Sequence, residues 1–214
     1  MPYKLSPSTL SLLSECPRCF WLNFNGVKRP ADIFPSLPSG MDKILKDHFD
    51  RYVGHGLPPE LHSLHGVKLF DDLEKLNVWR NNRKGLSWTD ASGNVLHGAV
   101  DNILMSGDKL IVLDYKTRGF PLKDDTAGHY QDQLDIYNFL LRKNGYDTCD
   151  YAYLLFYHPN TVDANGLVVF NKDLVKVSID VSNAERLWKK ALKVLSEKMP
   201  AAAPECEWCK WREN

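Results

Sequence analysis

Apolar residues follow a helical period in the N-terminal part of the chain. Leu10, Leu13 and Phe20 fall at the spacing of one helix face. Just before them, Ser6 and Pro7 are typical of an N-cap followed by the first helical residue. We therefore expect the chain to begin with helical structure.

The next stretch is also mainly helical by its pattern. Ser39 and Asp42 resemble a capping box, which predicts a helix from there to about residue 53. Residues 54–85 are ambiguous by their pattern, with Gly and Pro early and a short helix expected near residues 71–80. Residues 25–85 are therefore expected to form a helical insertion or lid.

After residue 85 the apolar positions mostly alternate or form short buried runs. The expected strands span residues 86–89, 95–105, 109–116, 151–158, 167–171 and 174–179, and the expected helices span residues 127–144 and 183–198. This order predicts an α/β fold, in which helices flank a mixed central sheet and residues 86–180 form the sheet core.

Composition narrows the class of protein further. The 214 residues include 27 Lys and Arg and 27 Asp and Glu, with 43% hydrophobic residues, which suits a single domain over residues 1–214. Zero net charge excludes a protein that coats nucleic acid by bulk positive charge.

The longest apolar run, at residues 151–157, is far shorter than the roughly 20 residues of a membrane span. The N-terminus lacks an apolar signal core, so we expect a cytoplasmic protein with no membrane partner.

The cysteines form a pattern that is typical of a metal site. Four of the five cysteines form two C-x-x-C pairs, Cys16 with Cys19 and Cys206 with Cys209. Paired thiolates at this spacing bind one metal ion or cluster from two turns of the chain. We expect a metal staple that joins residues 1–24 to residues 199–214. A redox site at the first pair, or unrelated buried thiols, are the alternatives that remain open.

Two acidic residues and a lysine are expected to meet on one face of the sheet. Asp114 and Lys116 lie two residues apart in a strand, so their side chains share a face. If Gly107 and Asp108 form a two-residue hairpin turn, the register places Asp101 opposite Asp114. Carboxylates at that spacing repel unless a cation lies between them, and a divalent ion with oxygen ligands would satisfy them. An ordinary cross-strand ion pair is the alternative.

These residues resemble the pattern of a known nuclease superfamily. An acid that ends one strand, D-Y-K on the next, and Gln133 and Tyr137 four residues apart on the following helix resemble the PD-(D/E)XK nuclease superfamily. The opening segment SPSTLSLLSECPRCFWL and the terminal cysteines are similar to its RecB-like and CRISPR-associated exonucleases. The resemblance implies a restriction-endonuclease-like core.

The resemblance also implies roles for individual residues. It implies a divalent-ion site, for Mg²⁺ or Mn²⁺, formed by Asp101, Asp114, the carbonyl of Tyr115 and His48. Lys116 would position or activate the attacking water and stabilise charge at the phosphate. Gln133 and Tyr137 would orient Lys116 or a substrate phosphate.

The cysteine arrangement departs from the resemblance in one respect. RecB-like relatives carry one early and three late cysteines around a 4Fe-4S cluster, whereas this chain has two early and two late. Two C-x-x-C pairs are also a common zinc arrangement. We expect a 4Fe-4S cluster at Cys16, Cys19, Cys206 and Cys209, with Zn²⁺ as the alternative.

A local basic segment supplies the expected contact with nucleic acid. Arg80, Arg83 and Lys84 lie between Trp79 and Trp88, two aromatic residues that could stack on bases. The expected function is a metal-dependent nuclease that cuts DNA at single-stranded ends or flaps, with RNA as a second substrate class. A helicase or a defence-system protein is a candidate partner. The alternative is a non-catalytic module that binds nucleic acid or a protein partner and keeps the nuclease fold.

Overall fold

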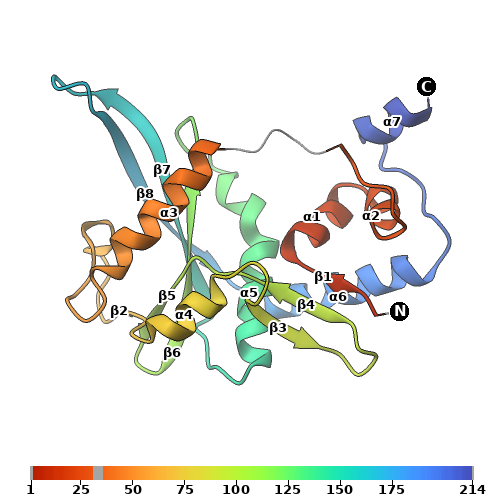
Figure 1. The fold of residues 1–214 in the computed structure, drawn as a ribbon, viewed down its shortest axis with the longest axis horizontal. Coiled ribbons are helices and arrows are strands. Elements are labelled where there is room, and N and C mark those ends of the chain that lie inside the picture. The colour runs from red at the N-terminus through yellow and green to blue at the C-terminus, as the bar shows by residue number, and fades with distance from the viewer. Residues whose placement is uncertain (1, 31–35, 214) are drawn as a thin grey trace.

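Helices pack around two β-sheets in the computed structural model, which describes residues 2–30 and 36–213 (Figure 1). The strands are β1 (Lys4–Leu5), β2 (Lys68–Leu69), β3 (Leu86–Thr89), β4 (Val95–Gly98), β5 (Asn102–Ser106), β6 (Lys109–Thr117), β7 (Tyr151–Val162) and β8 (Val168–Ser178). The helices are α1 (Pro7–Glu15), α2 (Pro17–Phe24), α3 (Ser36–Asp50), α4 (Leu73–Trp79), α5 (Gln131–Lys143), α6 (Val181–Ser196) and α7 (Glu207–Glu213), with 3₁₀ turns at Pro59–Leu61 and Thr126–Tyr130.

The larger sheet is mixed, as predicted. Its strand order is β2-β5-β6-β7-β8, and β6 and β7 are parallel while the other neighbours are antiparallel. The smaller sheet has the order β1-β4-β3. The predicted α/β class, with a mixed central sheet flanked by helices, is therefore confirmed, and it is consistent with a restriction-endonuclease-like core.

Strand β6 separates two apolar layers. Leu110 and Val112 pack with α5 and α6 on one face, whereas Ile111, Leu113 and Tyr115 pack with α3 on the other. This alternation follows from the two-residue period of a strand. Asp114 and Lys116 continue the row of Leu110 and Val112, so they point toward α5.

The N-terminal helical region is divided where proline follows cysteine. Ser6 caps α1 as predicted, and its hydroxyl accepts a hydrogen bond from the Thr9 amide. The chain leaves the helix at Cys16, whose φ of −158° is extended, because Pro17 disfavours helical backbone in the residue before it. The helical structure expected at the start of the chain thus consists of two helices, α1 and α2, with Cys16 at their junction.

The predicted start of α3 at Ser39 is wrong. The helix already includes Ser36, and Pro38 lies in its first turn, where a missing amide hydrogen costs no helical bond. Asp42 therefore lies inside the helix and is no capping-box partner. It forms an ion pair with Lys46, one turn further along the helix.

The predicted strand 95–105 is also wrong in one important respect. Its first part is β4 of the smaller sheet, and its last part is β5 of the larger sheet. Residues 99–101 cross from one sheet to the other. Asp101 therefore lies just before β5, in the gap between the two sheets, instead of within a strand.

Residues 25–85, expected to be an insertion or lid, contribute to the core where they are described. Strand β2 extends the larger sheet, and Leu45, Phe49 and Leu61 fill the apolar layer on the α3 face. The part of this range at 31–35 lies outside the described residues. This segment therefore covers one face of the sheet and brings α3 to the end of β6.

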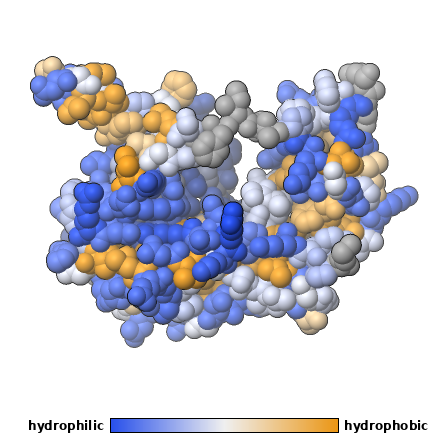
Figure 2. Space-filling view, in the orientation of Figure 1, coloured by the Kyte–Doolittle hydropathy of each residue, from blue (hydrophilic) through white to orange (hydrophobic). Residues whose placement is uncertain are grey.

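Strands β7 and β8 form a long hairpin that projects from the molecule at the upper left of Figure 1. Strand β8 replaces the two shorter strands that were expected near residues 167–171 and 174–179. Exposed apolar residues near its tip include Val162, Leu167 and Val168, and an orange patch marks the arm in Figure 2. No helix in the described parts of the chain has the length and hydropathy to span a bilayer.

Gly98 allows β4 to approach α5 closely. A Cβ at this position would lie 2.8 Å from Cε1 of the Tyr137 ring, which is held in the core. We expect Gly98→Ala to lower the free energy of unfolding by about 1–3 kcal/mol, through overpacking against a rigid ring. Denaturant unfolding measures the change. Gly119→Ala is the control, because a Cβ there has no neighbour within 4 Å. Equal stability of both variants would contradict the close approach.

Candidate active site and cysteine cluster

The β5–β6 hairpin brings the two predicted acids together. Its register pairs Ser106 with Lys109 and Asn102 with Leu113, as the sequence predicts. The next step of this register places Asp101 beside Asp114. Asp101 is fixed by the strand itself, since its Oδ2 accepts a hydrogen bond of 3.1 Å from the Tyr115 amide.

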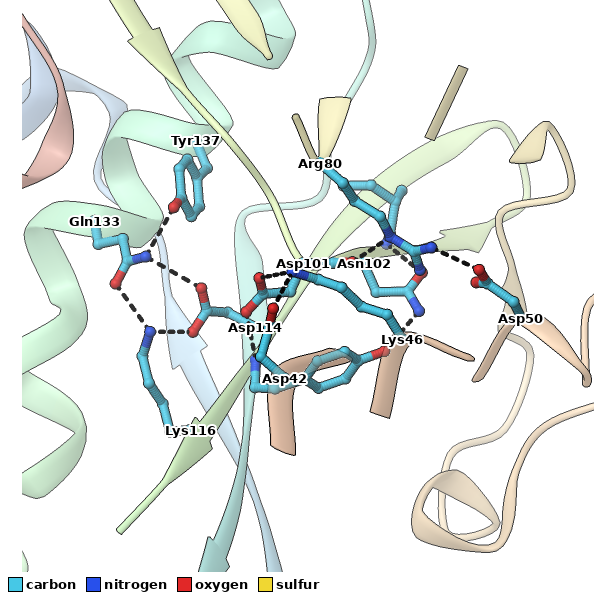
Figure 3. A network of polar contacts seen from close by, with 12 residues as sticks. Asp42, Lys46, Asp50, Arg80, Asp101, Asn102, Asp114, Lys116, Gln133 and Tyr137 are labelled. Atoms are coloured by element: carbon cyan, nitrogen blue, oxygen red, sulfur yellow. Dashed lines mark hydrogen bonds and ion pairs between the residues drawn. The ribbon is translucent and has the colours of Figure 1, made fainter. Parts of the chain in front are cut away.

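A chain of polar contacts links Asp114 to α5 (Figure 3). The Lys116 ammonium lies 2.5 Å from Asp114 Oδ2 and donates to Gln133 Oε1 at 3.1 Å. The Gln133 amide donates to Asp114 Oδ1 at 3.2 Å and to the Tyr137 hydroxyl at 2.8 Å. The structure thus brings together four predicted residues from β6 and α5. Sequence reasoning missed Tyr130, whose ring centre lies 4.7 Å from the Lys116 ammonium.

The charges of this network are strongly perturbed by burial and by each other. Asp114 is only 1% exposed. Burial and then the neighbouring Asp101 raise its pKa to about 7, although Lys116 opposes the shift. Burial alone would lower the pKa of Lys116, but the Asp114 carboxylate outweighs it and the pKa is raised. These shifts favour the protonated form of Lys116 and make Asp114 easier to protonate than an exposed aspartate.

Helix α3 contributes a lysine that sequence reasoning missed. Lys46 Nζ lies 3.0 Å from Asp101 Oδ1 and 2.8 Å from Asp42 Oδ2. Burial lowers its pKa, but the two carboxylates raise it by more, so the ammonium is retained. The only signal in the sequence is the spacing of Asp42 and Lys46, which is that of an ordinary helix ion pair.

The structure does not bring His48 to the acidic pair. Its Nε2 lies 3.2 Å from Glu60 Oε2, and its ring packs against Tyr52. Residues 46 and 48 are about 200° apart around a helix, so α3 cannot present both to Asp101. Because Lys46 faces the acids, the predicted ligand His48 faces away from them.

Arg80, predicted to bind nucleic acid, is a structural residue here. Its side chain is 8% exposed. Its Nε donates to the Asp101 carbonyl at 2.7 Å, and its Nη1 pairs with Asp50 of α3 at 2.8 Å. Arg83 and Lys84 are exposed on the following turn, so their predicted role stays open.

The two tryptophans expected to stack on bases are involved in packing instead. Trp79 is buried and stacks on Phe70 with ring centres 5.2 Å apart. Trp88 is half-buried and packs edge-on against Trp188. Both tryptophan rings therefore pack against aromatic residues of the protein itself, and the predicted stacking on bases is not supported.

A cavity of about 510 Å³ adjoins the network on the α5 side. Gln133 and Tyr137 form part of its wall, and the first residues of α1 face them. Gly98, His97 and His129 are also at its surface. Gln133 and Tyr137 are thus the members of the polar network that a ligand in this cavity could contact.

The four predicted metal-binding cysteines form one buried cluster. The ligand atoms of Cys16, Cys19, Cys206 and Cys209 all lie within 4.8 Å of one another. Among the described residues, no other set of three or more His, Cys, Asp and Glu side chains has this property. The cluster joins α2 to α7, so the predicted proximity of the two chain ends is confirmed.

Neighbouring donors favour a thiolate in this cluster. An Arg29 Nη2 donates to Cys206 Sγ at 3.6 Å. Although burial raises the pKa of Cys206, the Cys209 amide and the neighbouring thiols lower it to about 6 overall. Sulfur–sulfur distances are 3.5 Å for Cys19 and Cys206, 3.6 Å for Cys19 and Cys209, and 3.8 Å for Cys16 and Cys209.

Both sites suit metal ions by their donor chemistry. Asp101 and Asp114 offer hard oxygen ligands, and the pKa of Asp114 is raised by burial and then by repulsion from Asp101, both of which a divalent cation would offset. The direction of the Tyr115 carbonyl toward this site stays a prediction. The four thiols form a closed set, which is typical of a structural metal site.

Comparison with known proteins gives a family for the chain. The family model of the PD-(D/E)XK nuclease superfamily matches residues 30–213, which include the acidic pair, Lys116, Gln133 and the C-terminal cysteines. No curated protein matches the chain. The match extends over most of the described structure, and the N-terminal C-x-x-C pair lies before it.

Arg80 is expected to contribute to stability more than to binding. Arg80→Met would remove the contacts to Asp50 and to the Asp101 carbonyl, and lower the free energy of unfolding by about 2–3 kcal/mol. The exposed residue Arg83 is the matched control, since Arg83→Met changes the same charge without these contacts. Thermal or denaturant unfolding of both variants measures the difference. If Arg80→Met were as stable as the parent protein, the structural role would be wrong.

Proposed function

The chain belongs to the PD-(D/E)XK nuclease superfamily, and from that premise we propose that it is a divalent-metal-dependent nuclease that hydrolyses DNA. The observation that supports this most is the network of Asp114, Lys116 and Gln133 beside Asp101. A structural ion pair would need one acid and one base. Here two acids lie side by side, each with an ammonium beside it, and such a pair of like charges with one buried carboxylate is typical of a catalytic metal site.

Each residue of the network has a distinct part in the proposed reaction. A divalent ion held by Asp101 and Asp114 would acidify a bound water and neutralise charge on the scissile phosphate. Lys116 keeps its proton, so it serves as a cation that stabilises charge developing on the phosphate oxygens. Gln133 fixes the Lys116 ammonium, and the Tyr137 hydroxyl fixes Gln133.

The cavity beside Gln133 and Tyr137 supports a single strand as the substrate. Its volume of about 510 Å³ is in the range of small-molecule pockets, which suits one flexible strand better than a duplex. The exposed Arg83 and Lys84 supply positive charge for the phosphate backbone. We therefore propose single-stranded ends or flaps of DNA as the substrate, in the manner of RecB-like nucleases.

For the cysteine cluster we propose one zinc ion, in place of the iron–sulfur cluster expected from the sequence. Four ligands of one tetrahedral zinc ion have sulfurs about 3.8 Å apart, given Zn–S bonds of about 2.3 Å. Three of the six sulfur–sulfur distances, at 3.5–3.8 Å, are close to that geometry, and all six lie within 4.8 Å. In a 4Fe-4S cubane each thiolate binds a different iron, so the sulfurs would be further apart.

Substitution of Lys116 tests the nuclease proposal. Lys116→Met is expected to reduce cleavage of labelled single-stranded DNA at least 100-fold in Mg²⁺ or Mn²⁺, the loss typical of removing one charge-stabilising group. EDTA is expected to abolish cleavage by the parent protein. A panel of single- and double-stranded DNA and RNA, run in parallel, identifies the substrate class.

Lys109→Met is the matched control, because Lys109 is an exposed lysine at the other end of the same strand. It is expected to cleave like the parent protein. Equal activity of Lys116→Met and the parent would reject the nuclease proposal. DNA binding without cleavage by the parent protein would favour the alternative, a non-catalytic module with a nuclease fold.

Metal analysis tests the cysteine proposal. We expect colourless protein with one zinc per chain, even after anaerobic purification. Cys206→Ser is expected to lose the zinc and to lower the midpoint of thermal unfolding, because metal binding contributes to folding. Cys149→Ser is the control, since Cys149 lies outside the cluster. Brown protein with four irons per chain would contradict the single ion and leave the fold intact.

A further inference from the structure

Lys46 lies between two carboxylates on the α3 side of the active site (Figure 3). Its ammonium is 3.0 Å from Asp101 Oδ1 and 2.8 Å from Asp42 Oδ2, and its side chain is 21% exposed. A fully exposed ion pair between lysine and a carboxylate contributes little to the stability of a protein. This ammonium is shared by two acids and is largely buried. The proposed nuclease mechanism gives it no role.

Packing on both sides of Lys46 fixes its position. Phe49, on the same side of α3, packs its ring 4.8 Å from the ring of Tyr115. Asp50, one turn after Lys46, holds Arg80, which in turn binds the carbonyl of Asp101. Helix α3 is thus anchored to β6 and to the Asp101 backbone, which sets Lys46 opposite the Asp101 side chain.

Each carboxylate of the acidic pair already has an ammonium beside it without a metal ion. Asp114 has the ammonium of Lys116, and Asp101 has the ammonium of Lys46. A divalent ion bound between the acids would be repelled by the nearby ammonium groups of Lys116 and Lys46. Lys116 is also held by Gln133, whereas Lys46 has a second carboxylate, Asp42, on its own helix.

We propose that Lys46 is a built-in counter-ion of Asp101, which competes with the divalent ion and moves fully onto Asp42 when that ion binds. This inference rests on the proposed function, because it takes the acidic pair as the metal site. The flexible stem of lysine allows the ammonium to change partners without movement of the backbone. Asp42 is then a positioning residue that receives the displaced ammonium without touching the metal.

Binding of Mn²⁺ tests the competition without any measurement of cleavage. Mn²⁺ prefers oxygen ligands, so its binding reports on the acids and not on the cysteines. Free Mn²⁺ is followed by electron paramagnetic resonance during titration of the zinc-loaded protein. Lys46→Met is expected to bind Mn²⁺ about tenfold more tightly than the parent, the scale of a partly buried ion pair. Asp114→Asn is expected to lose this binding.

Lys43→Met is the matched control for charge. Lys43 is exposed on the same helix and is absent from the described ion pairs, so its loss changes the net charge alone. We expect it to bind Mn²⁺ as the parent protein does. A similar gain in both variants would show a general charge effect and would overturn the specific competition.

Substitution of Asp42 tests the exchange of partners in the opposite direction. Asp42→Asn leaves Lys46 with Asp101 alone, and is expected to weaken Mn²⁺ binding several-fold. In the Lys46→Met background the same substitution is expected to have little effect. If Asp42→Asn weakened binding equally in both backgrounds, it would act through charge alone and the exchange would be overturned.

Failure of this inference is distinct from failure of the proposed function. Mn²⁺ binding of equal strength by the parent and Lys46→Met would overturn the competition and leave the metal-dependent nuclease standing. Absence of Mn²⁺ binding in every variant would overturn both. Because Asp42 is half-exposed, we expect Asp42→Asn to fold even if Lys46→Met is unstable.

Discussion

The repulsion between Asp101 and Asp114 is the constraint on which the rest of the site depends. The β5–β6 register places the two carboxylates beside each other, and the burial of Asp114 removes the water that would screen them. Such a pair is unfavourable unless positive charge is supplied. The neighbouring elements supply it from two sides, with Lys116 on β6 and Lys46 on α3.

The alternation of β6 explains how two helices serve one site. Odd-numbered residues from Ile111 to Tyr115 anchor α3 on one face of the sheet, while Asp114 and Lys116 meet α5 on the other. Asp101 lies where the chain crosses between the two sheets, and its carboxylate contacts Lys46 of α3 and the Tyr115 amide of β6. The passage from β4 to β5 therefore places this carboxylate between α3 and Asp114, which itself meets α5.

Local patterns predicted the parts of the site that depend on neighbouring residues. The alternation of β6 and the turn at Gly107 were sufficient to place Asp114 beside Asp101, and the spacing of Gln133 and Tyr137 placed them on one helix face. The rotation of α3 and the burial of Arg80 depend on packing between distant segments. The prediction of His48 as a metal ligand failed because no local pattern shows which side of α3 faces the acids. The prediction of Arg80 as a nucleic-acid contact failed because no local pattern distinguishes an arginine that binds a carbonyl from one that binds phosphate.

The cysteine cluster and the active site are connected through the packing of the first helices. The cluster holds α2 to α7, and α1, which precedes α2 directly, packs against α5 and forms one wall of the cavity beside Gln133. Ser14 of α1 also donates to Asp132 of α5 at 3.5 Å. A metal ion bound by the cysteines would therefore hold α2 and, through it, α1. Because α1 faces Gln133 across the cavity, the metal would help to set the width of the cavity in which we propose that substrate binds.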